Sequence, residues 1–269
     1  MLLLGERPLI MGVLNVTPDS FSDGGKYMDP DLAYARAQQI EDEGADILDI
    51  GAESTRPGSE RISEGEELRR LIPVLKKLRD KLSIPISVDT YKANVALKAL
   101  EYGAEIINDP SGLTFDANIA KVTVQGNLGL IINHMRGTPE TWAKLGSIKD
   151  LVGSIASDLD ASVSRARRAG VERERIVIDP GIGFGKRTEQ NAEIIAKLPD
   201  LATMEFPMLV GPSRKQFLRQ STETETEFAT AAAVAAAVLC GAHIIRLHEV
   251  KMMKPVLEVA EAIFRAGGE

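Results

Sequence analysis

Several residue types on which whole classes of protein depend are scarce in this sequence of 269 residues. Cys240 is its one cysteine, which excludes an internal disulfide and a multi-cysteine zinc or iron–sulfur site. There are three histidines and no His-Glu-x-x-His spacing, the ligand pattern of many zinc enzymes. Cys240 falls in an alanine-rich segment with a helical pattern, and no serine has an evident base partner. We therefore expect chemistry without a protein nucleophile.

A basic excess and a long apolar run are missing as well. The sequence has 32 Lys and Arg against 39 Asp and Glu, and its net charge of −7 argues against nucleic acid as a partner. The most apolar run, residues 229–240, is shorter than the roughly 20 residues that cross a bilayer, so no membrane partner is expected. Residues 1–7 lack a basic leader followed by a long apolar stretch, which predicts no signal peptide and a cytoplasmic location.

What the chain does contain is a repeated pattern. No linker rich in Pro, Ser or Gly divides it, so we expect a single domain over residues 1–269. Short β-branched runs predict strands at 8–16, 46–51, 84–90, 105–110, 129–135, 175–181, 207–213 and 244–248. Longer amphipathic stretches predict helices at 31–43, 63–80, 91–102, 115–124, 149–169, 189–198, 214–220 with 225–240, and 249–266.

Eight strand–helix alternations in a chain of this length predict an α/β fold, the (β/α)₈ TIM barrel. The alternative is an open, doubly wound sheet, which usually has fewer strands. No Gly-x-Gly-x-x-Gly turn follows the first strand to support the dinucleotide site typical of that fold. The barrel is therefore favoured.

In a parallel barrel the carboxyl ends of all strands face one mouth, and here each predicted strand ends in polar residues. One polar strand end can simply cap the following helix, but this explanation does not suit all eight strands together. The pattern therefore predicts a ligand-binding mouth. Its candidate residues, in strand order, are Asn15, Asp49, Asp89, Asn108, Asn133, Asp179, Lys215 and Arg246.

The charges at this predicted mouth are of two kinds. Asp89 and Asp179, with Asp49 as a third candidate, suit a heterocycle that presents an amino group beside a ring N–H, because a carboxylate accepts two parallel hydrogen bonds. The amides of Asn108 and Asn133 are further partners for such a ring. Basic groups suited to phosphate follow other strands: Arg56, Arg214, Lys215, Arg246 and His248. The ligand should therefore have a donor-rich head and an anionic tail.

The histidines and one glycine-rich segment need separate interpretation. His248 and Arg246 share a face of the last strand, which favours an anion-binding or acid function for His248. His243 precedes that strand and is interpreted as a packing residue, whereas His134 either faces the barrel interior or anchors its loop.

Residues 179–186 (DPGIGFGK) lack the spacing of a phosphate-binding P-loop. Their glycines instead let the backbone approach a ligand closely.

Most of these residues fall within segments that resemble the bacterial dihydropteroate synthase family over nearly the whole chain. The first, second and sixth segments are long and specific, and all of them occur in the family's order. They are 15–25 (NVTPDSFSDGG), 49–58 (DIGAESTRPG), 87–90 (SVDT), 106–109 (IIND), 134–137 (HMRG), 179–186 (DPGIGFGK), 213–215 (SRK) and 246–248 (RLH).

The resemblance implies a TIM barrel that condenses 6-hydroxymethyl-7,8-dihydropterin diphosphate with 4-aminobenzoate, giving 7,8-dihydropteroate and diphosphate with the help of Mg²⁺. It also implies a homodimer, and a second-substrate site at which sulfonamides compete. By the resemblance, the pterin-binding residues are Asp89, Asn108, Met135, Asp179, Phe184 and Lys215, and the diphosphate-binding residues are Asn15, Arg246 and His248, with Asn15 also at the metal. The implied 4-aminobenzoate site comprises Phe21, Ser54, Thr55, Arg56, Pro57, Phe184 and Lys215. The implied catalytic set is Asp89, Asp179, Lys215, Arg246 and His248.

Two positions depart from the family pattern. Ala52 stands where a second glycine is common, and Gln216 stands where many members carry a serine associated with the aminobenzoate carboxylate. Backbone N–H groups at the expected helix start after Lys215 could replace that serine. Two alternatives share the barrel: a pterin-dependent methyltransferase and a non-catalytic pterin-binding relative. The diphosphate-binding residues argue against the first, and Lys215, Arg246 and His248 argue against the second.

Overall fold

The computed structural model describes residues 4–17, 29–54 and 58–267. Within these ranges the chain alternates strands and helices in the predicted order, and at least one helix follows every strand. The strands are β1 (Leu9–Asn15), β2 (Ile47–Gly51), β3 (Ile86–Asp89), β4 (Ile106–Asp109), β5 (Gly129–Asn133), β6 (Ile176–Asp179), β7 (Leu209–Val210) and β8 (Ile244–Leu247).

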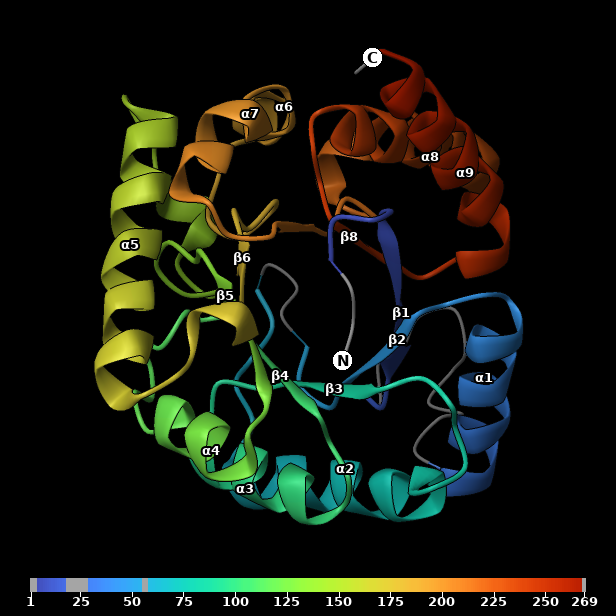
Figure 1. Cartoon of the computed structure of the whole chain (residues 1–269), viewed down its shortest axis with the longest axis vertical. Helices are drawn as coiled ribbons and strands as arrows, with labels where there is room; N and C mark the ends of the chain where they lie inside the picture. Colours follow the sequence, from blue (N-terminus) through green and yellow to red (C-terminus); the bar gives the residue numbers. More distant parts are fainter. Residues whose placement is uncertain (1–3, 18–28, 55–57, 268–269) are drawn as a thin grey trace.

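The strands form one parallel sheet in the order β6-β5-β4-β3-β2-β1-β8-β7. Its two ends meet through a parallel bridge between Ile178 and Met208, and the Ile178 N–H donates to the Pro207 carbonyl over 2.9 Å. The sheet therefore curls into a barrel, and Figure 1 shows its strands at the centre of a ring of helices. This confirms the predicted (β/α)₈ TIM barrel.

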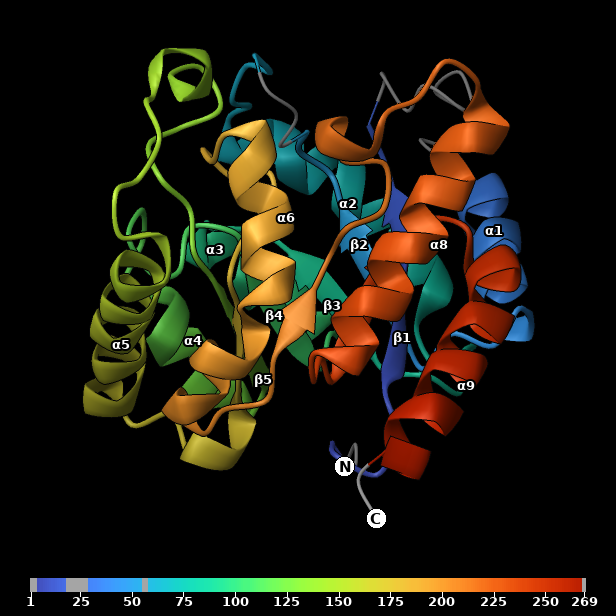
Figure 2. The ribbon, with the colours of Figure 1, turned by 90° about the horizontal axis from the view of Figure 1, so that it is seen from above.

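Nine α-helices lie in the described ranges, and Figure 2 shows several of them around the strands from the side. Capping residues explain several starts: Asp29, Ser63 and Asp150 each accept a hydrogen bond from a backbone N–H of the first turn, and Thr222 forms a capping box with Glu225. The helices are α1 (Pro30–Asp42), α2 (Glu64–Leu78), α3 (Ala93–Glu101), α4 (Ile119–Gly126), α5 (Leu151–Ala169), α6 (Thr188–Ala196), α7 (Leu198–Leu201), α8 (Glu223–Leu239) and α9 (Val250–Gly267).

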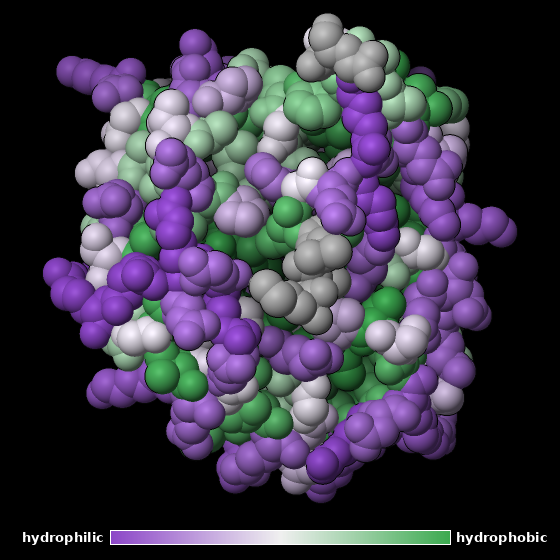
Figure 3. Space-filling view, viewed as in Figure 1, coloured by the Kyte–Doolittle hydropathy of each residue, from purple (hydrophilic) through white to green (hydrophobic). Residues whose placement is uncertain are grey.

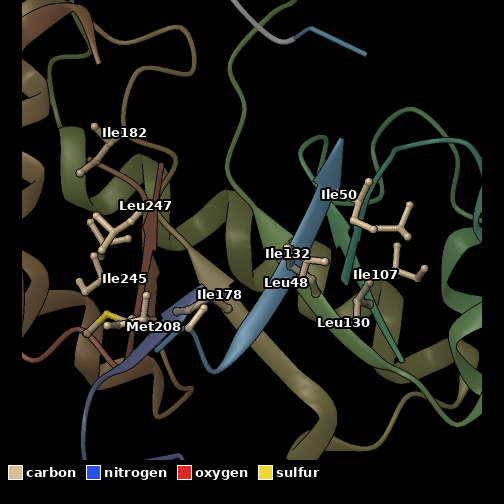
Figure 4. Packing of buried hydrophobic residues seen from close by; sticks show 14 of the residues in the cluster. Leu48, Ile50, Ile107, Leu130, Ile132, Ile178, Ile182, Met208, Ile245 and Leu247 are labelled. Atoms are coloured by element: carbon tan, nitrogen blue, oxygen red, sulfur yellow. The ribbon is translucent and has the colours of Figure 1, made fainter. Parts of the chain in front are cut away.

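Alternation along each strand divides the core into two apolar regions. One set of strand residues fills the barrel interior: Leu9, Met11, Ile47, Ile131, Val177, Leu209 and Ile244. The alternate set, which includes Leu48, Ile50, Ile107, Ile178 and Ile245, packs outward against the helices (Figure 4). Because both faces of the sheet are buried, the strands read as continuous apolar runs.

The prediction was wrong over residues 214–220, which were expected to be helical. Arg214 adopts a left-handed conformation with φ 57°, and Lys215 is extended. The only helical residues there are one 3₁₀ turn, Gln216–Leu218. The strand predicted at 207–213 is also reduced to two residues, because Pro207 and Pro212 on either side have no N–H to donate to a sheet.

The periphery of the molecule is polar. In Figure 3, viewed as in Figure 1, hydrophilic side chains cover most of the outer edge, where the solvent faces of the helices lie. Of the described helices, none combines the length and apolar character that a bilayer crossing requires.

Candidate active site

The sheet register places three of the predicted site residues in one row with Gly51 at the carboxyl ends of the strands. Asn15 pairs with Gly51, Gly51 with Asp89, and Asp89 with Asn108. Neighbouring strands lie about 4.8 Å apart, so side chains along such a row are within reach of one ligand. Farther round the barrel Asn133 pairs with Asp179. The predicted mouth is therefore present.

A pocket opens within this mouth and encloses about 340 Å³, including the space at its entrance. It brings Asp179 and Lys215 to the same end of the barrel, as the sequence predicted. Apolar and aromatic groups form part of its wall, and charged groups line the rest. The lining residues are Asp89, Asn108, Pro110, Asn133, Asp179, Ile182, Phe184, Gly211, Lys215 and Arg246.

The acidic and basic groups are less separated than the sequence analysis assumed. The Arg246 guanidinium donates from Nε to Asp49 Oδ2 over 2.7 Å and from Nη2 to Asp89 Oδ2 over 2.9 Å. The Asp49 carboxylate is fully buried and also accepts from Asn108 Nδ2 over 3.1 Å. Asp49, only a third candidate in the sequence, thus holds an arginine and an amide of the pocket in position.

Burial perturbs the charged groups of the pocket. It raises the pKa of Asp89 to about 7, although Arg246 opposes this rise. It also raises the pKa of Asp179, whose carboxylate accepts a hydrogen bond from the Gly181 N–H over 2.7 Å that opposes the shift. Burial, together with nearby Arg246, lowers the pKa of Lys215 to about 8. Perturbed pKa values on three convergent groups are typical of a functional site.

The loop after β6 approaches its neighbours very closely. A Cβ atom at Gly181, where φ is +74°, would lie 1.9 Å from the His134 carbonyl oxygen. Lys186 is half-buried under this loop, and its Nζ donates to the carbonyls of His134, Pro180 and Gly181 over 2.7 to 2.8 Å. Three acceptors match the three protons of an ammonium group. Sequence reasoning placed Lys186 in a motif but did not identify this structural function.

The three histidines occupy three different settings. His248 Nδ1 lies 3.0 Å from Ser213 Oγ, which connects β8 to the loop after β7. His134 points away from the pocket, because its Nε2 lies 3.1 Å from Asp158 on α5. Of its two open interpretations, the loop anchor is correct, and burial lowers its pKa to about 4. His243 Nδ1 accepts from the Met208 N–H over 3.2 Å, which confirms the packing interpretation.

Several predicted residues are not brought into the pocket. Arg214 was expected among the phosphate donors, but its guanidinium pairs with Glu249 and lies 3.9 Å from Glu227. Its left-handed backbone directs it away from the neighbouring Lys215. Met135 is half-buried and does not line the described pocket. Phe21, Thr55, Arg56 and Pro57 lie outside the described residues.

Comparison with known proteins agrees with this geometry. A model of the pterin binding enzyme family matches residues 11–248. A dihydropteroate synthase of Synechocystis is 45% identical over 97% of this chain and 92% of its own length. The chain belongs to the dihydropteroate synthase family. A synthase of Bacillus subtilis is 42% identical over 98% of this chain and 91% of its own. These names favour the synthase over the methyltransferase alternative.

Solved structures of this family have the same fold. A dihydropteroate synthase from Clostridium difficile, determined in the presence of pteroic acid, superposes with a TM-score of 0.91 and 41% identity over 98% of this chain and all of its own. A Xanthomonas albilineans synthase with 4-aminobenzoic acid has a TM-score of 0.87 and 37% identity over 96% of this chain and 93% of its own. A Yersinia pestis synthase in a sulfonamide drug complex has a TM-score of 0.91 and 37% identity, over 98% and 96% of the two chains.

Proposed function

We propose that this protein condenses 6-hydroxymethyl-7,8-dihydropterin diphosphate with 4-aminobenzoate to give 7,8-dihydropteroate and diphosphate. The observation that carries the proposal is the pocket itself, where Asp179 and Asn108 share one lining with the cations Lys215 and Arg246. Relatives with pteroic acid and 4-aminobenzoate in their structures support both substrates.

The pterin head matches the hydrogen-bonding groups at the bottom of the pocket. The Asp179 carboxylate is suited to accept from the amino group and the adjacent ring N–H, because the two donors are parallel. Asn108 and Asn133 each have a side-chain amide in the pocket wall. The side-chain oxygen of Asn133, Oδ1, has no hydrogen-bond partner among the described residues. Lys215 supplies a donor for a ring acceptor. These contacts fix the exocyclic methylene of the pterin toward the basic side.

The reaction breaks the C–O bond at this methylene, and the electron pair leaves with the diphosphate oxygen. Asp89 and Asp179 stabilise the positive charge that develops on the ring system, since both line the pocket, Asp179 buried and Asp89 half-buried. Arg246 and His248 stabilise the departing anion. The amine nitrogen of 4-aminobenzoate then bonds to the methylene carbon and releases a proton. No step needs a protein nucleophile, in accord with the sequence analysis.

Magnesium is part of the proposal. No group of three or more His, Cys, Asp or Glu residues gathers at a metal position within the described ranges. Asn15 is half-buried at the end of β1, and its Oδ1 faces the space above Gly51. One amide oxygen fits an ion that keeps several waters and takes its other ligands from phosphate. Mg²⁺ bound in this way would supply charge to the leaving diphosphate.

The second substrate should lie beside Phe184 and Lys215, near the loop after β2. In the loop after β2, Ser54 is the one predicted 4-aminobenzoate residue that lies within the described ranges. Its carbonyl accepts a hydrogen bond from Ser59 Oγ over 2.6 Å. Gln216 begins a single 3₁₀ turn rather than a helix, so the expected helix start is not available to bind the aminobenzoate carboxylate. Gln216 and Ala52 should therefore affect affinity for 4-aminobenzoate and sulfonamides, rather than pterin binding.

A homodimer and a cytoplasmic location complete the proposal. Exposed apolar side chains lie on both α8 and α9, where Phe228 is 72% exposed and Phe264 is 51% exposed. Met252, Val259 and Ile263 on α9 extend the same kind of surface. A second copy of this chain is the proposed occupant. Light scattering should give twice the chain mass for the wild type and the chain mass for Phe264→Glu, and a monomeric wild type would refute the dimer.

The test of the activity is diphosphate release. The purified protein is incubated with dihydropterin diphosphate and Mg²⁺, with or without 4-aminobenzoate. We expect release that depends on the amine, and strong loss of release in Asp179→Asn. The exposed Asp160→Asn on α5 is the control and should match wild type. No amine-dependent release by folded wild type would refute the synthase, whereas pterin binding without turnover would support the non-catalytic relative.

A further inference from the structure

The one tryptophan of the chain lies directly behind the pocket. Trp142 is in the loop between β5 and α5, where its side chain is buried although Thr141, Ala143 and Lys144 around it are exposed. Its indole meets the Phe184 ring edge to face, with centroids 5.5 Å apart and planes at 73°. This arrangement is a favourable geometry for two aromatic rings.

Phe184 in turn contacts the cation of the pocket. The Lys215 Nζ lies 4.3 Å from the centroid of the Phe184 ring, a distance typical of a cation–π contact. The backbone of Phe184 is fixed, because its N–H donates to the Gly181 carbonyl and its carbonyl accepts from the Arg136 N–H. The orientation of this half-buried ring then depends on its side-chain contacts, with Trp142 at one and Lys215 at another.

The loop that carries Trp142 also contacts the other side of the proposed second-substrate site. Its Pro139 carbonyl accepts a hydrogen bond from the Gly58 N–H over 3.1 Å, close to Ser54 in the loop after β2. Within the loop, the N–H groups of Thr141 and Trp142 donate to the Thr138 carbonyl. One firmly folded loop thus connects the two loops that contain the described members of this site.

We propose that Trp142 is a positioning residue for the second substrate, because its indole holds the Phe184 ring against the Lys215 ammonium at the edge of the pocket. The inference rests on the proposed function for the identity of that substrate. In this proposed role, Trp142 contacts neither the carboxylates that face the pterin nor the reacting atoms. It acts through Phe184.

The first test compares three variants of the loop by steady-state kinetics. Trp142→Leu keeps an apolar side chain but removes the ring, and should raise the KM for 4-aminobenzoate about 3- to 10-fold, the size of a lost aromatic contact, with a smaller change in kcat. Trp142→Phe restores an edge-to-face partner and should lie close to wild type. Leu145→Ala is the control, because it shortens an apolar side chain of the same loop. Equal KM values for Trp142→Leu and wild type would overturn the proposal, as would a Trp142→Phe variant as impaired as Trp142→Leu.

The second test separates positioning from a general loss of structure. The face of the Phe184 ring favours the charged form of Lys215, whose pKa is about 8 in wild type. In Trp142→Leu this support is weaker, so Lys215 should lose its proton sooner as the pH rises. The alkaline limit of pterin binding should therefore lie at a lower pH in Trp142→Leu than in wild type. The other charged groups that act on Lys215 are unchanged in these variants: Asp89 on β3, Asp179 on β6, Lys186 after β6 and Arg246 on β8. Identical pH limits in the two proteins would contradict the assignment.

A double-mutant cycle gives the most specific result. If Trp142 acts through Phe184, Trp142→Leu should change neither KM nor the pH limit further in a Phe184→Leu background. Fully additive effects would overturn the proposal. The pH measurement needs only pterin binding, so it remains informative about Trp142 even if the wild type proves to have no synthase activity.

Discussion

Replacement of Lys186 by methionine tests how the glycine-rich loop after β6 is held. Methionine has a similar length but donates no hydrogen bond, so the carbonyls of His134, Pro180 and Gly181 would lose the donor that they share. At a net value of about 0.5–1.5 kcal/mol for each hydrogen bond, the three bonds stabilise the fold by about 2–4 kcal/mol.

One opposing effect reduces this value. Burial lowers the pKa of Lys186 well below its usual range, so the ammonium carries a desolvation cost that methionine avoids. We therefore expect Lys186→Met to lower the free energy of unfolding by about 2–3 kcal/mol. At about 2–4 °C for each kcal/mol in a protein of this size, Tm should fall by about 4–12 °C.

Urea unfolding followed by circular dichroism measures this difference, with calorimetry for Tm. The matched control is Lys197→Met, because Lys197 is exposed and its partner Asp200 lies 3.4 Å away at the surface. The control should change stability by less than about 0.5 kcal/mol. If Lys186→Met and Lys197→Met unfold at the same urea concentration, the three carbonyl contacts contribute nothing net and the reasoning is refuted.

Three further predictions concern the pocket and its loop. Arg246→Ala should weaken binding of inorganic diphosphate at least about tenfold, because a charged donor is lost; calorimetric titration showing unchanged affinity would refute its assigned function. Gly181→Ala should lower Tm strongly, because the new Cβ would lie 1.9 Å from a backbone oxygen. Gly146→Ala is the control and should leave Tm unchanged, because no atom lies within 4 Å of its new Cβ. Equal melting temperatures of the two variants would contradict this prediction. Pterin binding should be strongest between about pH 7 and 8. It should fall in acid as Asp89 takes up a proton and fall in base as Lys215 loses one; a flat titration profile would be evidence against both assignments.

Much of the fold and part of the site could be predicted because barrel geometry follows from a local pattern. Strand periodicity and the position of each strand's last polar residue were enough to place Asp89, Asn108 and Asp179 at one mouth. In a parallel barrel this inference needs no knowledge of loop structure, since every strand carboxyl end faces the same way. Lys215 was placed correctly for the same reason, as it follows β7 closely.

Other parts of the site depend on partners that are distant in sequence. Arg214 and Lys215 are adjacent basic residues, and the sequence predicts phosphate binding equally for both. Only the left-handed backbone at Arg214 directs its side chain to Glu249, whereas Lys215 stays in the pocket. The position of Asp49 beside Arg246 and the function proposed for Trp142 likewise come from contacts with β8 and with the loop after β6. No spacing rule contains this information.

The sequence by itself determined which residues could meet, because alternation and strand order follow from local backbone geometry. The tertiary structure decided which of them pair with each other. Arg246 lies between the carboxylates of Asp49 and Asp89, and His134 turns toward α5 instead of the barrel interior. The physical reason is that a polar or charged group buried away from water needs a hydrogen-bonding partner within about 3 Å, and that partner is identified only when the chain has closed around it.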